Sequence, residues 1–295
     1  MDKQQMIERI TTGQGFIAAL DQSGGSTPKA LRGYGVEDSE WSGDDEMFGA
    51  IHAMRARVIT APSFASGKVI GAILFEKTMD GEVDGQPTAE ALKARGVVPF
   101  IKVDEGLADE ADGVQLMKPM GKLPALLEKS VAAGMFGTKM RSVIKSANPA
   151  GIAAIVAQQF EVAGQILDAG LVPMIEPEYD ITAADRAAGE EILLAEIMKH
   201  LDALPEGREV MLKLSIPVTP GLYTPLVSHP RVLRVVALSG GFSTDEACER
   251  LAQNPGMIAS FSRGLLQDLR KGQSDAEFDA VLGKAIDQIA AASVA

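Results

Sequence analysis

The segment from Gly137 to Glu176 contains one complete strand–helix–strand unit. It reads GTKMR at 137–141, NPAGIAAIVAQQFEVAGQILDA at 148–169 and LVPMIE at 171–176. Short apolar runs bounded by turn residues are typical of buried strands, whereas the long central stretch has the period of an amphipathic helix. A helix between two strands indicates that the strands are parallel, because the connection has to cross one face of the sheet.

The same alternation extends along the whole chain. Strands are expected at 16–21, 70–75, 98–102, 137–141, 171–176, 209–213, 234–239 and 257–261, and helices at 44–58, 122–134, 148–169, 185–203, 244–253 and 275–293. Eight strands in about 250 residues or more favour a closed (β/α)8 TIM barrel over an open doubly wound α/β sheet, which is the alternative. No long linker interrupts residues 1–295, so we predict a single domain.

Composition and charge exclude several classes of protein. Of the 295 residues 46% are hydrophobic and 23% charged, which is typical of a globular chain. A net charge of −12 argues against binding to nucleic acid or to an anionic membrane. The sequence has one cysteine, no apolar core of a signal peptide and no run of about 18 apolar residues. We therefore expect a cytoplasmic protein that does not span a membrane.

Each expected strand ends in, or is closely followed by, a polar or charged residue. These residues are Asp21, Glu76, Lys102, Lys139 with Arg141, Glu176, Lys213, Ser239 and Arg263. Barrel active sites lie at the carboxyl ends of the strands, so we expect the side chains to converge on one mouth. Four of them follow one another at intervals of 37 residues: Lys102, Lys139, Glu176 and Lys213. Any single one could instead be a solvated loop residue or half of a structural ion pair.

Lys213 lies in EVMLKLSIP at 209–217, with apolar residues on both sides. Burial disfavours a charged amine, and a neutral amine is a nucleophile that condenses with a carbonyl to form a Schiff base. The iminium is an electron sink, so this lysine indicates aldol chemistry at a neighbouring carbon–carbon bond. Carboxylates have to carry the protons, and Glu176, Glu178 and Asp21 are the candidates. The alternative is an outward lysine on an alternating strand.

Two turns rich in Gly and Ser follow expected strands, DQSGGS at 21–26 and SGG at 239–241. Glycine lets backbone N–H groups approach an oxyanion, and barrels commonly bind phosphate at the loops after strands seven and eight. Arg263 would add a charged fork at the second turn. Two such turns predict a substrate phosphorylated at both ends, although each turn alone is also compatible with an ordinary tight turn.

Neither metal nor cofactor signatures occur in the sequence. His52, His200 and His229 do not have the spacing of metal ligands, and a single cysteine excludes a thiolate zinc cluster. No P-loop is present, and no glycine-rich dinucleotide turn follows a strand. We therefore expect no metal and no cofactor.

Eight ordered motifs carry a resemblance to a known family. They are GFIAALDQSGGSTPKAL at 15–31, GAILFEKTM at 71–79, PFIKVDEG at 99–106, GTKMRS at 137–142, GLVPMIEPE at 170–178, VMLKLSIPVTPG at 210–221, ALSGGFS at 237–243 and ASFSRGL at 259–265. The sequence resembles a class I fructose-bisphosphate aldolase of the compact bacterial type. The resemblance implies a TIM barrel that reversibly cleaves fructose 1,6-bisphosphate into dihydroxyacetone phosphate and glyceraldehyde 3-phosphate, as in glycolysis and gluconeogenesis, through a lysine imine and without metal.

The resemblance also implies a role for each catalytic residue. Lys213 corresponds to the Schiff-base lysine, and Glu176 to the acid and base that handles the carbinolamine and iminium protons. Asp21 is similar to the aspartate that takes the hydroxyl proton during carbon–carbon cleavage. Lys139 matches the lysine that polarises the intermediates, and Glu178 resembles a supporting member of the carboxylate–lysine network.

The expected substrate-binding residues form two groups. The phosphate on the ketone half is expected at Ser239, Gly240 and Arg263. The distal phosphate is expected at Ser23, Ser26 and Lys102, with Lys29 and Arg141 as second contacts. The partner implied is thus a small phosphorylated sugar, bound by a monomer or a small homo-oligomer.

Two features depart from the family pattern. Longer relatives have a C-terminal extension that ends in a tyrosine, whereas this sequence ends at Ala295 without an aromatic residue, so its enamine proton relay is expected to differ. Ser262 stands before Arg263 where many relatives have glycine. A Schiff-base aldolase for another phosphorylated sugar is the second reading, and a barrel with a non-catalytic binding or adhesin role is the third.

Overall fold

Eight parallel strands form a nearly closed barrel in the computed structural model, which describes residues 1–295. The strands, in barrel order, are β1 (Phe16–Leu20), β2 (Val69–Leu74), β5 (Val98–Lys102), β7 (Gly137–Ile144), β8 (Val172–Tyr179), β9 (Val210–Ser215), β10 (Val232–Leu238) and β11 (Met257–Ala259). No ladder joins β11 to β1; the backbone N–H of Ala19 donates to the carbonyl of Phe261 at 3.5 Å across this seam. The predicted TIM barrel is confirmed, with all eight expected strands.

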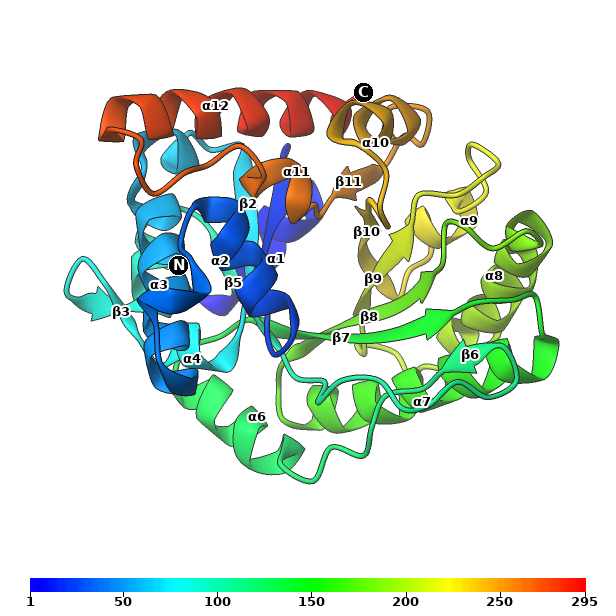
Figure 1. Ribbon diagram of the computed structural model, residues 1–295. Helices are drawn as coiled ribbons and strands as arrows, with labels where there is room; N and C mark the ends of the chain where they lie inside the picture. The colour runs from blue at the N-terminus through cyan, green and yellow to red at the C-terminus, as the bar shows by residue number, and fades with distance from the viewer.

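The six expected helices are present on the outside of the strands (Figure 1). They are α3 (Gly43–Thr60), α6 (Leu123–Ala132), α7 (Pro149–Asp168), α8 (Arg186–Asp202), α10 (Thr244–Leu251) and α12 (Asp275–Ala292). Asn148 caps α7 by accepting from the N–H groups of Ala150 and Gly151, and Pro149 suits the first helical position because it has no N–H to leave unpaired. Local sequence therefore determines where α7 begins.

The structure contains further helices, 3-10 turns and short strands that were not predicted from the sequence. These are α1 (Lys3–Thr12), α2 (Ser26–Tyr34), α4 (Glu76–Met79), α5 (Thr88–Ala94), α9 (Thr224–Val227), α11 (Arg263–Leu266), the 3-10 turns η1 (Asp38–Glu40) and η2 (Pro62–Ala65), and the short strands β3 (Glu82–Val83), β4 (Gln86–Pro87) and β6 (Val114–Gln115). Strands β3 and β4 form a separate hairpin, and β6 pairs antiparallel with β7. Most of these elements are too short to show a periodicity.

Helix α7 is the one helix long and apolar enough to cross a membrane by length and composition alone. Half of its most apolar window is buried inside the protein. Its buried residues include Ile152, Ile155 and Phe160, which belong to the main hydrophobic core. The helix therefore packs as a core element of the barrel.

The interior of the barrel is apolar in its middle layer and charged nearer the carboxyl ends of the strands. Phe100, Met174 and Met211 belong to a buried cluster inside the strands, separate from the larger core between strands and helices. Because side chains two residues apart on a strand share a face, Lys102, Glu176 and Lys213 follow these three on the inner face, one layer nearer the carboxyl ends. Strand alternation thus places charges at the mouth.

The regular 37-residue spacing corresponds only partly to the strand register. Lys102 is the direct partner of Lys139, but Lys139 pairs with Met174, two residues before Glu176. A barrel closes only if its strands are staggered, and a two-residue step keeps the same side chains facing inward. Glu176 therefore lies inside the barrel but further along the axis than Lys139.

Helix α1 closes the amino-terminal end of the barrel. Met6 and Ile10 on this helix are buried in the same cluster as the residues inside the strands. Arg234 on β10 fixes the end of the helix by donating to the carbonyl oxygens of Ile10 and Gly13 at 2.9 and 2.7 Å. The apolar plug leaves the carboxyl ends of the strands as the open side.

We predict that Ile10→Ala lowers the free energy of unfolding by about 2–5 kcal/mol, because it leaves a cavity in the barrel interior. Urea denaturation monitored by circular dichroism measures the change. Glu8→Ala, an exposed change on the same helix, should alter stability by less than about 0.5 kcal/mol. Equal effects of the two substitutions would contradict the assignment of α1 as a plug.

Candidate active site

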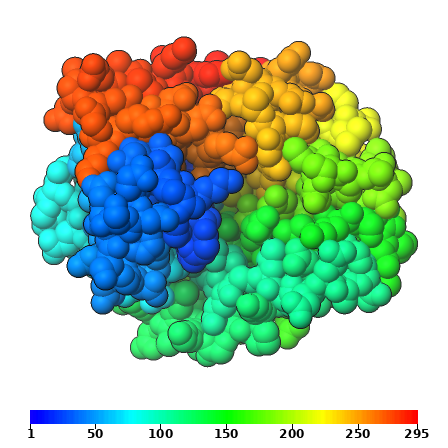
Figure 2. All heavy atoms as spheres, in the orientation of Figure 1, coloured from blue at the N-terminus to red at the C-terminus, as the bar shows by residue number.

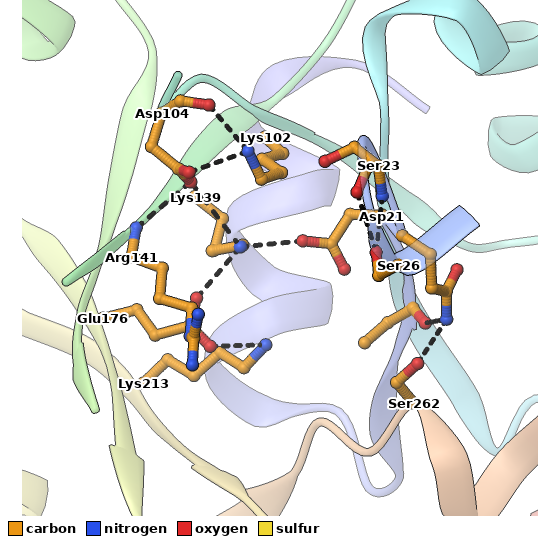
Figure 3. Close-up of polar contacts among 12 residues, drawn as sticks. Asp21, Ser23, Ser26, Lys102, Asp104, Lys139, Arg141, Glu176, Lys213 and Ser262 are labelled. Atoms are coloured by element: carbon orange, nitrogen blue, oxygen red, sulfur yellow. Dashed lines mark hydrogen bonds and ion pairs between the residues drawn. The ribbon is translucent and has the colours of Figure 1, made fainter. Parts of the chain in front are cut away.

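A buried lysine, Lys139, lies at the centre of the charges in the barrel mouth (Figure 3). Its Nζ is 2.7 Å from Asp21 Oδ2, 3.0 Å from Glu176 Oε2 and 3.8 Å from Asp104 Oδ2. The three carboxylates come from the end of β1, from β8 and from the residues after β5. One cation on β7 therefore holds together acidic groups from three other parts of the barrel.

Lys213 contacts the opposite oxygen of the same glutamate. Its Nζ lies 3.0 Å from Glu176 Oε1, and the side chains of both residues are only 4–5% exposed. The carboxylate of Glu176 thus lies between the amines of Lys139 and Lys213. A group in this position can accept a proton from Lys213 and return it over a single hydrogen-bond length. The predicted convergence of these three residues is present in the structure.

The lysines determine the ionisation of the central groups. Burial opposes the charge on Asp21, but the attraction of Lys139 and Lys213 outweighs it and holds the pKa of Asp21 well below its usual value. Burial likewise opposes the charge on Lys139, but Asp21, Glu176 and Asp104 together raise the pKa of Lys139 well above its usual value. Asp21 is therefore a carboxylate and Lys139 an ammonium across the neutral range.

The backbone of Glu176 is held from behind by α7. Its N–H donates to Gln159 Oε1 at 3.3 Å, and Gln159 Nε2 donates to Ser142 Oγ at 2.8 Å. All three residues are buried. This contact fixes the amide orientation of Gln159, because its oxygen and nitrogen each have one partner. The carboxylate is consequently supported by groups that lie outside the mouth.

Most of the expected site residues line one cavity of about 550 Å³ at the mouth, near the centre of the face shown in Figure 2. This main cavity contains Asp21, Ser26, Lys29, Lys139, Arg141, Glu176, Glu178, Lys213, Ser239, Gly240 and Arg263. The two remaining residues, Ser23 and Lys102, line an adjoining hollow of about 430 Å³ that shares Asp21 and Ser26 with the main cavity. All thirteen expected residues therefore lie around one opening.

Several of the expected binding residues already have partners. Lys102 Nζ lies 2.7 Å from Asp104 Oδ1 and donates to the carbonyl of Asp104 at 2.6 Å. Arg141 forms an ion pair with Glu178. By contrast, the side chains of Lys29 and Arg263 line the cavity without a carboxylate partner. These two cations are available to an anionic ligand with no internal contact to break.

The turn at Ser239–Gly241 brings backbone close to its neighbours. Gly240 has a φ of +60°, and a Cβ there would lie 2.6 Å from Cγ2 of Ile181. Glycine is required on both counts, since a side chain would meet strain and a steric clash at once. The turn can therefore present backbone N–H groups to the cavity at short range.

Asp104, Gln22 and Gln159 contact the site but are not among the residues predicted from the sequence. Asp104 contacts both Lys102 and Lys139, and its Oδ2 accepts from the backbone N–H of Arg141 at 3.2 Å. It stands two residues after Lys102 in the motif PFIKVDEG, so the rule that charges cluster at strand ends would have found it. Gln159 lies in the middle of a helix, where nothing in the sequence indicates a contact with the site.

Comparisons with known proteins bear on the family and on the fold. The family model for glycolytic fructose-bisphosphate aldolase class-I matches residues 3–231. Fructose-bisphosphate aldolase from Plasmodium falciparum, solved in a ternary complex with TRAP and a small-molecule inhibitor, shares 19% identity with a TM-score of 0.77, and the match covers 99% of this chain and 94% of that one. Cgl0159 from Corynebacterium glutamicum shares 15% identity with a TM-score of 0.54, covering 99% and 92%. At these identities the structural matches show a common fold.

We predict that Lys139→Met lowers the free energy of unfolding at pH 7 by about 3–5 kcal/mol, because the buried carboxylates lose their shared cation. With that attraction removed, the pKa of Asp21 rises above its wild-type value, although Lys213 and Lys102 still oppose the rise, so the folded variant takes up a proton at a higher pH than the wild type does. The deficit relative to the wild type should therefore shrink as the pH falls from 7 towards 4. In the wild type the pKa of Asp21 is lower in the folded state than in the unfolded state. The stability that the ionised Asp21 contributes is therefore lost only as the pH falls below the pKa of an ordinary aspartate.

Urea denaturation at a series of pH values tests this prediction. Lys199→Met is the matched control, because the Lys199 side chain is 72% exposed and pairs only with Glu196 on its own helix. The control should change stability by less than about 1 kcal/mol. A deficit in Lys139→Met that stays constant with pH would contradict the proposed ionisation of the cluster.

Proposed function

Because this chain belongs to the class I fructose-bisphosphate aldolase family, it is an aldolase of the Schiff-base type, and we propose that it reversibly cleaves fructose 1,6-bisphosphate. The observation that carries the proposal is the position of the Glu176 carboxylate, 3.0 Å from the amines of both Lys213 and Lys139 in a buried mouth. An imine mechanism needs an amine nucleophile next to a group that exchanges protons with it.

The first step is formation of the imine. Glu176 takes a proton from Lys213, and the neutral amine attacks the C2 ketone of the substrate. One proton then moves from the attached nitrogen to the new alkoxide, which gives the neutral carbinolamine. Glu176 then returns the proton to the carbinolamine hydroxyl, which leaves as water and produces the iminium. Glu176 Oε2 lies 3.0 Å from Lys139 Nζ and has no other partner, so this oxygen is free to carry the proton and to donate it to the reacting hydroxyl.

The second step is cleavage of the carbon–carbon bond. Asp21 is ionised and takes the proton of the C4 hydroxyl, the bond between C3 and C4 breaks, and its electron pair moves into the iminium to form an enamine. The aldehyde product leaves. The enamine gains one proton at C3, which balances the proton that Asp21 has taken, so that Asp21 returns to its ionised form. Hydrolysis of the resulting iminium by one water then releases the ketone product and regenerates Lys213. The ammonium of Lys139 polarises the oxygen atoms that pass through negative charge.

Two groups of residues around the cavity suit two phosphate groups. Ser239, Gly240 and Arg263 offer backbone N–H groups and a guanidinium without a carboxylate partner. Ser23, Ser26, Lys102 and Lys29 are grouped beside the other loop, and we propose that they bind the distal phosphate. Lys102 would exchange its contact with Asp104 for the phosphate. Each group contains one cation without a carboxylate partner, Arg263 in the first and Lys29 in the second, and this favours a bisphosphate over a monophosphate.

The presence of all the reactive groups weighs against the two alternatives. An aldolase for another phosphorylated sugar would share Lys213 and Glu176 and would differ in the distal contacts, so substrate comparison separates it from the leading proposal. A purely non-catalytic binding role would not need a buried amine beside a buried carboxylate, an arrangement that burial makes costly. We place the reaction in the cytoplasm, with no metal or cofactor taking part.

We predict that borohydride reduction in the presence of dihydroxyacetone phosphate traps a covalent adduct on Lys213, because borohydride converts the imine to a stable secondary amine. Peptide mass spectrometry locates the adduct. Lys213→Met should show no adduct and should cleave fructose 1,6-bisphosphate at least about 10⁴-fold more slowly. Lys199→Met should behave as the wild type, with and without a chelator.

Two outcomes of that experiment would contradict the mechanism. One is an unmodified Lys213 after reduction, and the other is an adduct on a different lysine. Activity that disappears with a chelator and returns with a divalent cation would contradict the proposal that no metal takes part.

We predict that the two phosphate groups can be separated by substitution. Arg263→Ala should raise KM about 10-fold or more for both fructose 1,6-bisphosphate and fructose 1-phosphate, since both carry the C1 phosphate. Ser26→Ala should raise KM for the bisphosphate alone. Steady-state kinetics with the two substrates measures this, and a bisphosphate-specific effect of Arg263→Ala would reverse the assignment of the two ends.

A further inference from the structure

The seam between the first and last strands is the least connected part of the barrel. Every other neighbouring pair forms a parallel ladder, but β1 is joined to the β11 side only by the bond from Ala19 N–H to the carbonyl of Phe261, two residues after β11 ends. The loops that leave this seam carry residues from both proposed phosphate groups. Ser23 and Ser26 follow β1, and Arg263 follows β11. The backbone ladder therefore does not fix the distance between these loops.

One side chain spans the seam at the level of the mouth. Gln22 Nε2 donates a hydrogen bond to Ser262 Oγ, and it also lies 3.3 Å from the carbonyl of Ala19. Gln22 stands between Asp21 and Ser23, while Ser262 directly precedes Arg263. Figure 3 shows Ser262 on the same side of the mouth as Asp21, Ser23 and Ser26, opposite Lys139 and Lys213. Gln22 is thus the direct side-chain link between the two loops.

A buried arginine fixes the orientation of Gln22. The side chain of Arg55, on α3, is completely buried, and its guanidinium donates to the carbonyl oxygen of Gln22 at 2.5 Å and to Oε1 of Gln22 at 3.2 Å. It also donates to Thr78 Oγ1 at 2.7 Å. A guanidinium only donates, so the Gln22 amide has to turn its oxygen towards Arg55 and its nitrogen towards Ser262.

Arg55 has no carboxylate partner, which is unusual for a buried charge. Burial lowers the pKa of Arg55 to about 10, and the nearest compensating charge is that of Asp21, which acts on it through space. Burial of a charge without a contacting counterion is costly. A purely structural position could be filled at lower cost by an apolar side chain, which would make neither the two hydrogen bonds to Gln22 nor the one to Thr78.

We infer that Arg55 and Gln22 are positioning residues that fix the separation of the two phosphate-binding loops across the β1–β11 seam, and that they thereby determine the preference for a substrate phosphorylated at both ends. This inference rests on the proposed function, because it concerns the same cavity and a bisphosphate substrate. A monophosphate engages one loop at a time. A bisphosphate has to engage both at once, so a change in their separation penalises it more.

The experiment measures kcat/KM for fructose 1,6-bisphosphate and for fructose 1-phosphate, and compares their ratio among variants. Gln22→Ala is expected to lower this ratio about tenfold or more. Trapping of the dihydroxyacetone phosphate adduct on Lys213 should continue, because the imine chemistry lies on the opposite wall. Gln158→Ala is the matched control, since Gln158 also joins two segments by its amide, through the backbone of Met117, but away from the mouth.

Further variants separate positioning from general destabilisation. Arg55→Met should lower the ratio as Gln22→Ala does, and Arg55→Lys should restore part of it, because lysine keeps the charge and can donate to Gln22. Ser262→Ala removes only the acceptor hydroxyl, so it tests the link even where Arg55→Met does not fold. In a double-mutant cycle, Gln22→Ala and Ser262→Ala should be non-additive in their effect on the ratio.

The outcomes are distinguishable. A wild-type enzyme that forms the Lys213 adduct but shows no preference for the bisphosphate overturns the proposed substrate, and the inference with it. A wild-type preference that survives in Gln22→Ala overturns the inference alone. Additive effects in the cycle, or equal losses for both substrates in every variant, also overturn it, because they would show that the link supports only the fold.

Discussion

The balance of buried charge at the barrel mouth is the constraint on which the rest of this molecule depends. Three lysines, Lys102, Lys139 and Lys213, face three carboxylates, those of Asp21, Asp104 and Glu176, and nearly all of these side chains are shielded from water. Water cannot stabilise these charges, so each depends on its neighbours. Because the groups come from five different strands or strand ends, the barrel has to bring every strand to the correct height before any one of them is satisfied.

Such a balanced cluster is also suited to moving protons. When a proton passes from an ammonium to an adjoining carboxylate, two opposite charges disappear together and the total charge in the mouth is unchanged. The surroundings therefore need little rearrangement, and the cost of each transfer stays low. The support of Glu176 by Gln159 and Ser142 from outside the barrel serves the same end, since it holds the exchanging group still while its protonation changes.

The sequence was sufficient for the strands, for six of the helices and for the inward direction of the main charges, because these follow from local periodicity and from alternation along a strand. It was insufficient wherever an interaction joins distant segments. The offset between Lys139 and Glu176 depends on barrel stagger, which no single strand records. The burial of Arg55 beneath Gln22 depends on how α3 packs against the loop after β1. Helix α1 was missed because only Met6 and Ile10 of its ten mostly polar residues are buried, and they are buried by the barrel interior.

Helix α1 has a consequence for the order of events. Met6 and Ile10 fill the amino-terminal end of the barrel, so substrate and products reach and leave Lys213 through the opening at the carboxyl ends of the strands. Under the proposed chemistry, the ketone fragment stays tethered after cleavage, and the water that frees it has to arrive by the route along which the aldehyde departs. The aldehyde and the water thus use one route, so apolar side chains far from the reacting atoms favour departure of the aldehyde before hydrolysis releases the ketone.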